Sequence, residues 1–211
     1  MRRELNMEVQ KEHFKDHVAT LIEYNNIKVL DFKNPNTNNY RIRFVFEEDY
    51  CNLHISGDLG YLSASNYNNM TYNSFSDFVN NIGYFEEKIQ CHSRPLHYYD
   101  YGDAFSELQE RIKDGEYTKE ELLDAIYSYD TEKDMDNVIS DVIDEILSDF
   151  DDTNGISQEG YEVLERIDPD CFEWAGNLGL YSSGILELYM LAFKLATEQL
   201  KNVEPDCVMF I

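Results

Sequence analysis

Basic residues are scarce in this chain. Its 211 residues include 17 Lys and Arg but 42 Asp and Glu, so the formal net charge is −25. A protein with this field repels nucleic acid and anionic lipid headgroups and attracts basic protein surfaces. We therefore expect no direct DNA binding, and a basic nucleic-acid-binding protein is the fitting kind of partner. The alternative interpretation is that the charge serves solubility alone.

Long apolar runs and paired cysteines are also missing. No run approaches the roughly 18 apolar residues of a membrane span, and the stretch from Met1 to Glu4 lacks the apolar core of a signal peptide. The four cysteines lie far apart and form no CxxC pair, which is typical of reduced thiols. We expect a cytoplasmic protein with no membrane contact.

Motifs of the common enzyme classes are absent as well. There is no Walker loop, no GxSxG, no GxGxxG and no signature of a Cys/His/Asn triad. These absences lower the expectation of catalysis, and we predict no catalytic residue and no cofactor.

One glycine-containing stretch, ISGDLG at residues 55–60, raises the question of a phosphate-binding loop. Such a loop opens a helix, so that backbone N–H groups meet the anion. Here the next residues, 61–65, are β-like instead. A two-residue loop with glycine first suits a hairpin, so we predict a β-turn with Gly57 and Asp58 at its tip.

The hydropathy pattern predicts an α+β fold. Residues 1–100 read as an N-terminal helix (8–24), a β-prone run (27–32), a small antiparallel meander of about four strands, and a helix over 76–89. Residues 101–211 read as an acidic helical half, with helices over 103–112, from the capping box at Thr118 onward, and over 135–150, 157–167 and 180–200. The last is apolar nearly all round, so we expect it at the centre of the helical half. The two parts form one compact domain or two tightly packed lobes.

The acidic residues concentrate in this second half, where residues 101–211 hold 28 Asp and Glu against 7 Lys and Arg. The helix over 135–150 carries an apolar stripe, with carboxylates on its other side. Carboxylates at helical spacing lie about 5–6 Å apart, comparable to a string of phosphates. The predicted partner-binding residues are Asp134, Asp141, Glu145, Asp149 and Asp152.

Histidine and arginine residues of the first half offer an alternative site. If the strand register holds, three of them share the outer face of the sheet. Such residues together can perform acid–base chemistry on a phosphodiester, so the alternative function is a small enzyme that processes RNA or nucleotides. This polar patch comprises Arg41, Arg43, His54, His92, Arg94 and His97.

Three segments have incomplete metal-site patterns. His13 and His17 are four residues apart but lack a third ligand, and read as solvated helix residues. The cluster of Cys91, His92 and His97 lacks a fourth ligand. The loop at 150–161 has Phe and Tyr where a calcium loop requires carboxylates at its first and last positions. We expect no metal.

Several segments resemble small acidic proteins carried by phages and prophages of low-GC Gram-positive bacteria. They are the helix at His13–Lys15, the strand at Tyr40–Arg43, ISGDLG at 55–60, IGYFEEKI at 82–89 and CHSRPLHYYD at 91–100. Proteins of this type include anti-CRISPR and anti-restriction inhibitors. The resemblance implies a phage-encoded inhibitor that acts in the bacterial cytoplasm on a nucleic-acid-targeting defence enzyme, for example a Cas nuclease such as Cas9 or its guide complex.

Overall fold

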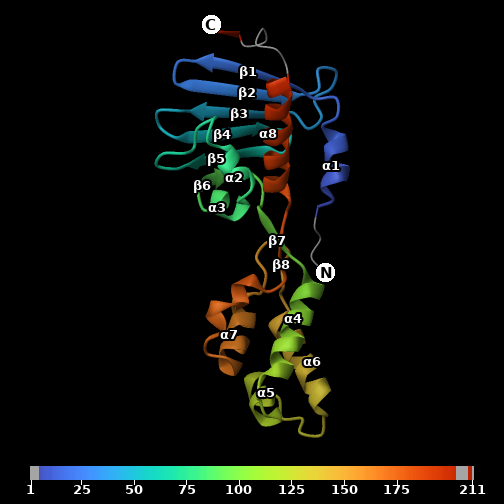
Figure 1. The fold of residues 1–211 in the computed structure, drawn as a ribbon. Helices are drawn as coiled ribbons and strands as arrows, with labels where there is room; N and C mark the ends of the chain where they lie inside the picture. The colour runs from blue at the N-terminus through green and yellow to red at the C-terminus, as the bar shows by residue number, and fades with distance from the viewer. Residues whose placement is uncertain (1–4, 203–208, 211) are drawn as a thin grey trace. The chain divides into compact units, whose positions relative to one another are not determined.

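The structure, a computed structural model, describes residues 5–202 and the strand at 209–210. The fold is α+β, as predicted, with a meander sheet and a helical segment (Figure 1). The chain forms two compact units. Of the described residues, 5–96, 184–202 and 209–210 belong to the sheet unit, and 97–183 belong to the helical unit. The helical unit is thus an insertion, and the division differs from the predicted boundary after residue 100.

Six antiparallel strands form the meander of the sheet unit, where about four were expected. In spatial order they are β6, β5, β4, β3, β2 and β1, and β9 joins β1 in parallel. The bounds are β1 Val18–Tyr24, β2 Ile27–Lys33, β3 Ile42–Glu47, β4 Asn52–Gly57, β5 Gly60–Ser65, β6 Ile89–His92 and β9 Met209–Phe210.

The N-terminal helix α1 spans only Met7–His13, so the prediction of a helix over 8–24 was wrong. Strand β1 follows it and pairs with β2 through a two-residue turn, with Tyr24 opposite Ile27. Asn25 opens that turn at φ 52°, a left-handed conformation that asparagine tolerates better than most residues. The apolar residues of 18–24 fit helical spacing, but cross-strand pairing determines their structure.

The ISGDLG stretch forms a β-hairpin, and no helix follows it. Gly57 pairs with Gly60 across the hairpin, so the tip residues are Asp58 and Leu59, one position later than predicted. Gly57 has φ 152°, and a Cβ atom there would lie 2.0 Å from the carbonyl oxygen of Arg41. Only glycine fits this position without strain.

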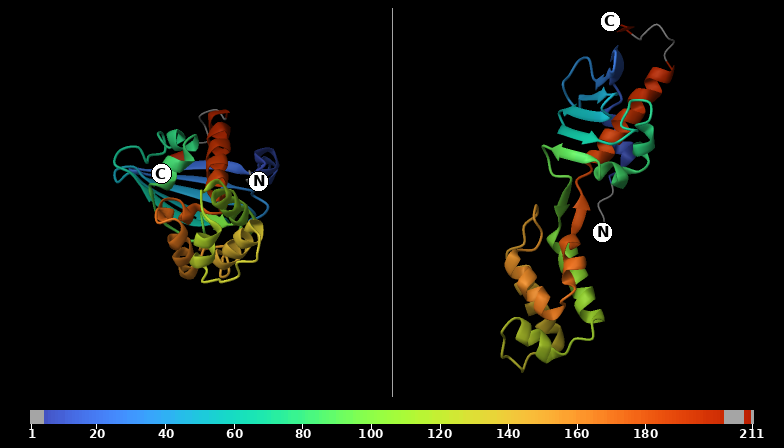
Figure 2. Two further views of the ribbon diagram at one scale, coloured as in Figure 1. Left: turned by 90° about the horizontal axis from the view of Figure 1, so that it is seen from below. Right: turned by 90° about the vertical axis from the view of Figure 1, so that its left-hand side faces the viewer.

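Helix α8 (Ile185–Asn202) crosses the strands on one face of the sheet (Figures 1 and 2). Phe193 on α8 packs against Phe44 on β3 and Phe75, with ring centroids 5.6 and 4.8 Å away. Full burial of one such side chain contributes about 1.5–3 kcal/mol. The prediction that this helix forms the centre of the helical half was wrong, because it belongs to the sheet unit. No described helix is long and apolar enough to cross a membrane.

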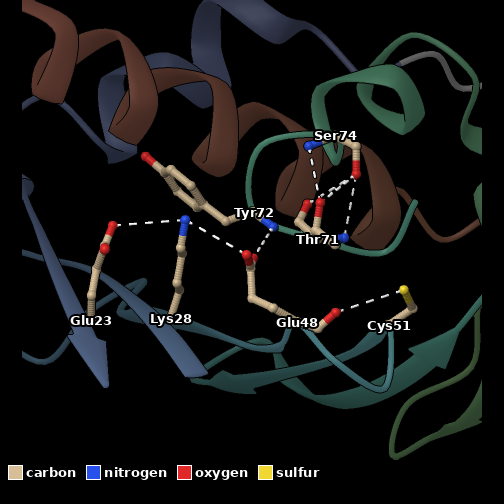
Figure 3. A network of polar contacts seen from close by, with 7 residues as sticks. All are labelled: Glu23, Lys28, Glu48, Cys51, Thr71, Tyr72 and Ser74. Carbon is tan, nitrogen blue, oxygen red and sulfur yellow. Dashed lines mark hydrogen bonds and ion pairs between the residues drawn. The ribbon is translucent and has the colours of Figure 1, made fainter. Parts of the chain in front are cut away.

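A network of hydrogen bonds and ion pairs connects the segment between β5 and β6 to the sheet (Figure 3). Glu48 accepts a hydrogen bond from the Tyr72 backbone N–H at 2.8 Å. Lys28, on β2, lies 3.6 Å from Glu48 and 3.8 Å from Glu23.

Two short helices lie in the segment between β5 and β6, α2 (Ser76–Val79) and α3 (Ile82–Glu86). The single helix predicted over 76–89 is therefore broken in two, and Ile89 begins β6.

The helical unit is entered and left through a two-stranded ribbon, β7 (His97–Tyr99) paired with β8 (Leu180–Ser182). Between these strands the chain forms α4 (Tyr101–Asp114), α5 (Lys119–Ala125), α6 (Met135–Ile146) and α7 (Gln158–Ile167), then short 3-10 turns at Cys171–Glu173 and Ala175–Asn177. Each α-helix begins at a polar cap, and the predicted capping box of Thr118 and Glu121 is present. The unit has a hydrophobic core of its own.

Candidate partner-binding surface

The negative charge of the chain is concentrated in the helical unit. Residues 97–183 contain 25 Asp and Glu against 5 Lys and Arg, a net charge of −20. All other residues together contain 17 Asp and Glu against 12 Lys and Arg, a net charge of −5. The structure thus assigns most of the charge excess to one compact inserted unit.

Helix α6 presents part of the predicted acidic set. Its buried stripe is the predicted one: Val138, Ile139, Val142, Ile143 and Ile146. The helix ends at Ile146, four residues before the predicted end. Asp149 and Asp152 therefore lie in the following turn and loop, both exposed. The five predicted carboxylates belong to one segment but do not form a single helical row.

Two members of the set have local structural roles. Asp134 is the N-cap of α6 and accepts a hydrogen bond from the Asn137 backbone N–H at 2.9 Å. Asp141 forms an ion pair with Lys133 at 2.5 Å, and its side chain is only 35% exposed. Glu145 is exposed. The carboxylates most available to a partner are therefore the later members of the set.

Two further carboxylates of α6 are exposed and lie outside the predicted set. Residues of an α-helix advance by about 100° each, which places Asp144 directly opposite the buried stripe. Asp136, near the start of the helix, has a side chain that is 86% exposed and lies 3.6 Å from Lys113. A helical wheel of the sequence would have found both residues.

The loop between α5 and α6 presents an exposed aromatic side chain. Tyr129 is 91% exposed. Tyr127, two residues earlier, has φ 54°. The central carbon of the Arg166 guanidinium lies over the Tyr127 ring, 4.8 Å from the centroid of that ring. Exposed tyrosines are frequent anchors of protein interfaces, so the loop gives the acidic surface an apolar contact point.

The loop after α6 is held by its own side chains. Asp151 accepts hydrogen bonds from the backbone N–H groups of Thr153 and Asn154, both at 2.9 Å. The hydrogen bond from the Thr153 hydroxyl, together with these backbone bonds and the bond from the Asn154 side chain, holds the pKa of Asp151 below its usual value. Gly155 has φ 75° and closes this loop, where it forms an isolated antiparallel β-bridge with Asp151. No group of three or more potential metal ligands occurs among the residues that the structure describes.

The predicted polar patch is divided between the two units. His97 lies in β7 of the helical unit, whereas the other five residues lie in the sheet unit. Arg43 and His54 do share the outer face of the sheet with one another, opposite the buried Phe44 and Leu53. This part of the register prediction is confirmed.

Within the sheet unit, each arginine of the patch contacts an acidic residue, and Arg41 and Arg94 share Asp58. Arg43 binds Asp31 with two hydrogen bonds of 3.0 and 2.7 Å. Burial alone would raise the pKa of Asp31, but the hydrogen bonds and charges of Arg43 and Lys33 hold it below its usual value. A hollow of about 350 Å³ adjoins these residues and also contacts Arg41 and Gly57. It offers positive charge but no histidine that could act as a base.

The remaining patch residues meet the hairpin tip or a neighbouring strand. Arg41 lies 3.4 Å from the carboxylate of Asp58, and Arg94 donates to the Asp58 carbonyl at 3.3 Å. His92 contacts the carbonyl of Arg94 at 2.7 Å. His54 lies 3.7 Å from Glu47. These contacts hold Arg41 and Arg94 at the hairpin tip and His54 beside β3, and none of them joins two histidines of the patch.

His17 is not a solvated helix residue, contrary to expectation. It follows α1 and is only 4% exposed. Its Nε2 atom donates to the carbonyl of Tyr40 at 3.1 Å, while Nδ1 is buried without a hydrogen-bond partner in the described structure. The ring packs between Phe14 and Phe32. His13, which is exposed, stacks on the ring of Tyr40.

No model of a known protein family, no curated protein and no solved structure matches this chain.

Proposed function

We propose that this protein is an inhibitor that binds a basic, nucleic-acid-handling enzyme through the acidic surface of its helical unit. The observation that carries the proposal is the net charge of −20 on residues 97–183, against −5 on all other residues. If the charge served solubility alone, no such concentration in one unit would be required. A unit of this charge acts as a surface for a partner rich in Lys and Arg.

The acidic surface would inhibit the enzyme by competing with nucleic acid for its binding channel. Duplex DNA carries about one negative charge per 1.7 Å of axis, so a protein channel that binds it presents many cations. The exposed carboxylates of Asp144 and Glu145 on α6, with Asp149 in the following turn, would supply negative charge to such a channel. Occupation of the channel by the helical unit would exclude the nucleic acid.

An aromatic contact complements the charge. Electrostatic attraction mainly accelerates encounter, whereas buried aromatic residues supply much of the binding free energy at interfaces. Tyr129 lies in the loop that leads into α6 and is 91% exposed. We assign it the role of the aromatic anchor.

The resemblance to phage-encoded inhibitors narrows the kind of partner. We propose a defence enzyme of the bacterial host, with a Cas nuclease such as Cas9, or its guide complex, as the first candidate. The inhibitor would then act in the host cytoplasm. The alternative function, an RNA- or nucleotide-processing enzyme, draws support from the cationic hollow beside Lys33, Arg41 and Arg43, but that hollow contains no histidine.

A capture experiment with a matched control tests the proposal. The full chain is immobilised and exposed to lysate of a low-GC Gram-positive bacterium at low salt, and captured proteins are identified by mass spectrometry. The surface variant carries Asp144→Asn, Glu145→Gln and Asp149→Asn. The control variant removes the same charge from exposed positions of the sheet unit, with Asp49→Asn, Asp77→Asn and Glu198→Gln.

We expect the wild type and the control variant to capture the same nucleic-acid-binding enzyme, and the surface variant to capture much less of it. The complex should weaken as salt shortens the Debye length from about 30 Å at 0.01 M to about 8 Å at 0.15 M. Equal capture by both variants would contradict the assignment of the surface. Turnover of RNA or nucleotides by the purified chain would favour the alternative function.

A further inference from the structure

The helical unit contains a cavity that the acidic surface of α6 does not include. Its volume is about 500 Å³, and it lies beside α4, the turn after it, and α7. Apolar side chains of Ile112, Leu164 and Ile167 contribute to its lining. Besides Arg111, the lining includes two aromatic rings and four carboxylates: Tyr117, Trp174, Glu107, Glu110, Asp114 and Asp168.

The two aromatic rings are held in place by their neighbours. The indole N–H of Trp174 donates to Asp168 at 3.1 Å. The ring of Tyr117 packs against Gly115, where a Cβ atom would lie 2.0 Å from the ring. Burial and then the charges of Asp168 and Glu121 raise the pKa of Tyr117, so its hydroxyl stays neutral. The cavity thus has fixed aromatic walls before any ligand arrives.

The structure already places one guanidinium on these walls. The central carbon of the Arg111 guanidinium lies 4.1 Å from the centroid of the Trp174 ring, within the range of a cation–π interaction. Arg111 is the single cation among the lining residues, against four carboxylates. The cavity therefore keeps an excess of three negative charges.

Two of the carboxylates have no partner within the described part of the chain. No hydrogen bond or ion pair engages Glu110 or Asp114, and both are exposed. Glu107 accepts only a long hydrogen bond of 3.4 Å, from the Gly179 N–H. Carboxylates beside an aromatic wall are the groups that bind a guanidinium by charge-assisted hydrogen bonds and stacking.

We infer that this cavity receives an arginine side chain of the protein partner. The inference rests on the proposed function for the identity of the partner, but the chemistry of the cavity stands separately. A guanidinium is planar and weakly hydrated, so it can stack on a ring and bind a carboxylate at the same time, whereas an ammonium is a strongly hydrated point charge. Phosphates and other anions are repelled by the carboxylates.

Fluorescence of Trp174 gives a direct test, because it is the single tryptophan of the chain. The full-length protein is titrated with N-acetyl-arginine methylamide, and in parallel with the corresponding citrulline and lysine compounds. Citrulline keeps the shape of arginine without its charge. We expect a saturable change with arginine at millimolar concentration, at least five-fold weaker binding of lysine, and no saturable change with citrulline.

Two isosteric variants decide whether the cavity is responsible. Glu110→Gln with Asp114→Asn should weaken arginine binding at least five-fold. Asp144→Asn with Glu145→Gln removes the same charge from α6, outside the cavity, and should change it by less than two-fold. Unchanged thermal midpoints confirm that both variants fold. Equal responses to arginine and citrulline, or equal weakening by both variants, would overturn the inference.

The titration needs no partner, so its failure is distinguishable from that of the proposed function. No arginine-specific response, together with α6-dependent capture of an enzyme, would refute the arginine site and leave the inhibitor proposal intact. An arginine-specific response without any captured enzyme would refute the inhibitor proposal and confirm the guanidinium chemistry of the cavity. Once a partner is found, Glu110→Gln with Asp114→Asn should weaken its binding as well.

Discussion

The ammonium nitrogen of Lys133 lies 2.5 Å from the carboxylate of Asp141. This ion pair couples the loop before α6 to the helix and neutralises one of the predicted partner-binding residues. The hydrogen bond to Asp141 raises the pKa of Lys133, so the lysine stays charged throughout the neutral range.

Removal of this lysine should strengthen the acidic surface. Lys133→Gln frees the Asp141 charge and deletes one of the five cations of residues 97–183. We expect the association rate with a basic partner to rise about two-fold at low salt, with little change at high salt, because steering is screened. Surface plasmon resonance against the captured enzyme measures both rates. A slower association at low salt would show that Lys133 itself contacts the partner.

Buried His17 should make the sheet unit sensitive to acid. Burial lowers its pKa from the ordinary value of 6.5, against smaller opposing effects of the carbonyls of Tyr40 and Asn39 and the charge of Asp16. The folded state therefore keeps the ring neutral, while the unfolded state takes up a proton as the pH falls below 6.5. Stability is present above that pH and is lost below it, by up to about 1.4 kcal/mol for each unit of pKa difference.

A pair of substitutions isolates this histidine. His17→Gln should flatten the dependence of the free energy of unfolding on pH below about 6.5, at a cost of about 1 kcal/mol at neutral pH from the altered buried hydrogen bond. His13→Gln, at an exposed position, should leave the pH dependence as in the wild type. Urea unfolding at several pH values provides the comparison. An unchanged slope in His17→Gln would mean that other groups determine the acid sensitivity.

The hairpin glycine should be intolerant of a side chain. Gly57→Ala forces a Cβ atom toward the Arg41 carbonyl at φ 152°, and the backbone strain alone costs about 1–3 kcal/mol. Gly83→Ala is the matched control, because open space surrounds that position in α3. It should be neutral or stabilising by up to about 1 kcal/mol. Similar thermal midpoints for the two variants would contradict the hairpin geometry.

Histidine substitutions separate the inhibitor from the enzyme. His54→Ala and His92→Ala should leave capture of the partner unchanged, because both side chains belong to the sheet unit and contact its own strands and loops. Neither substitution should change any activity of the purified protein on RNA or nucleotides. An activity on RNA or nucleotides that is lost in either variant would instead support the polar patch as a catalytic site.

Much of the fold was predictable from local patterns. The core stripe of α6 and the capping box of Thr118 with Glu121 depend on neighbours three or four residues away, which a sequence displays directly. The alternation of Ile42, Phe44 and Phe46 likewise predicted the inner face of β3.

Other features depend on distant partners. The apolar residues of 18–24 form a strand because β2 pairs with them, and α8 belongs to the sheet unit because its aromatic residues pack there. Neither fact is encoded in local periodicity. The same holds for the cavity beside Trp174, since its lining comes from α4, α7 and the segment after α7.

The most direct measurement is the binding kinetics of the two charge-matched triple variants against the captured enzyme, at about 0.01 M and 0.15 M salt. If the helical unit binds a basic surface, Asp144→Asn, Glu145→Gln and Asp149→Asn should slow association on the order of five-fold at low salt and less at high salt. Asp49→Asn, Asp77→Asn and Glu198→Gln should keep the wild-type rates within about two-fold. Identical kinetics of the two variants at both salt concentrations would contradict the inhibitor proposal and leave the acidic face of α6 as solvated surface.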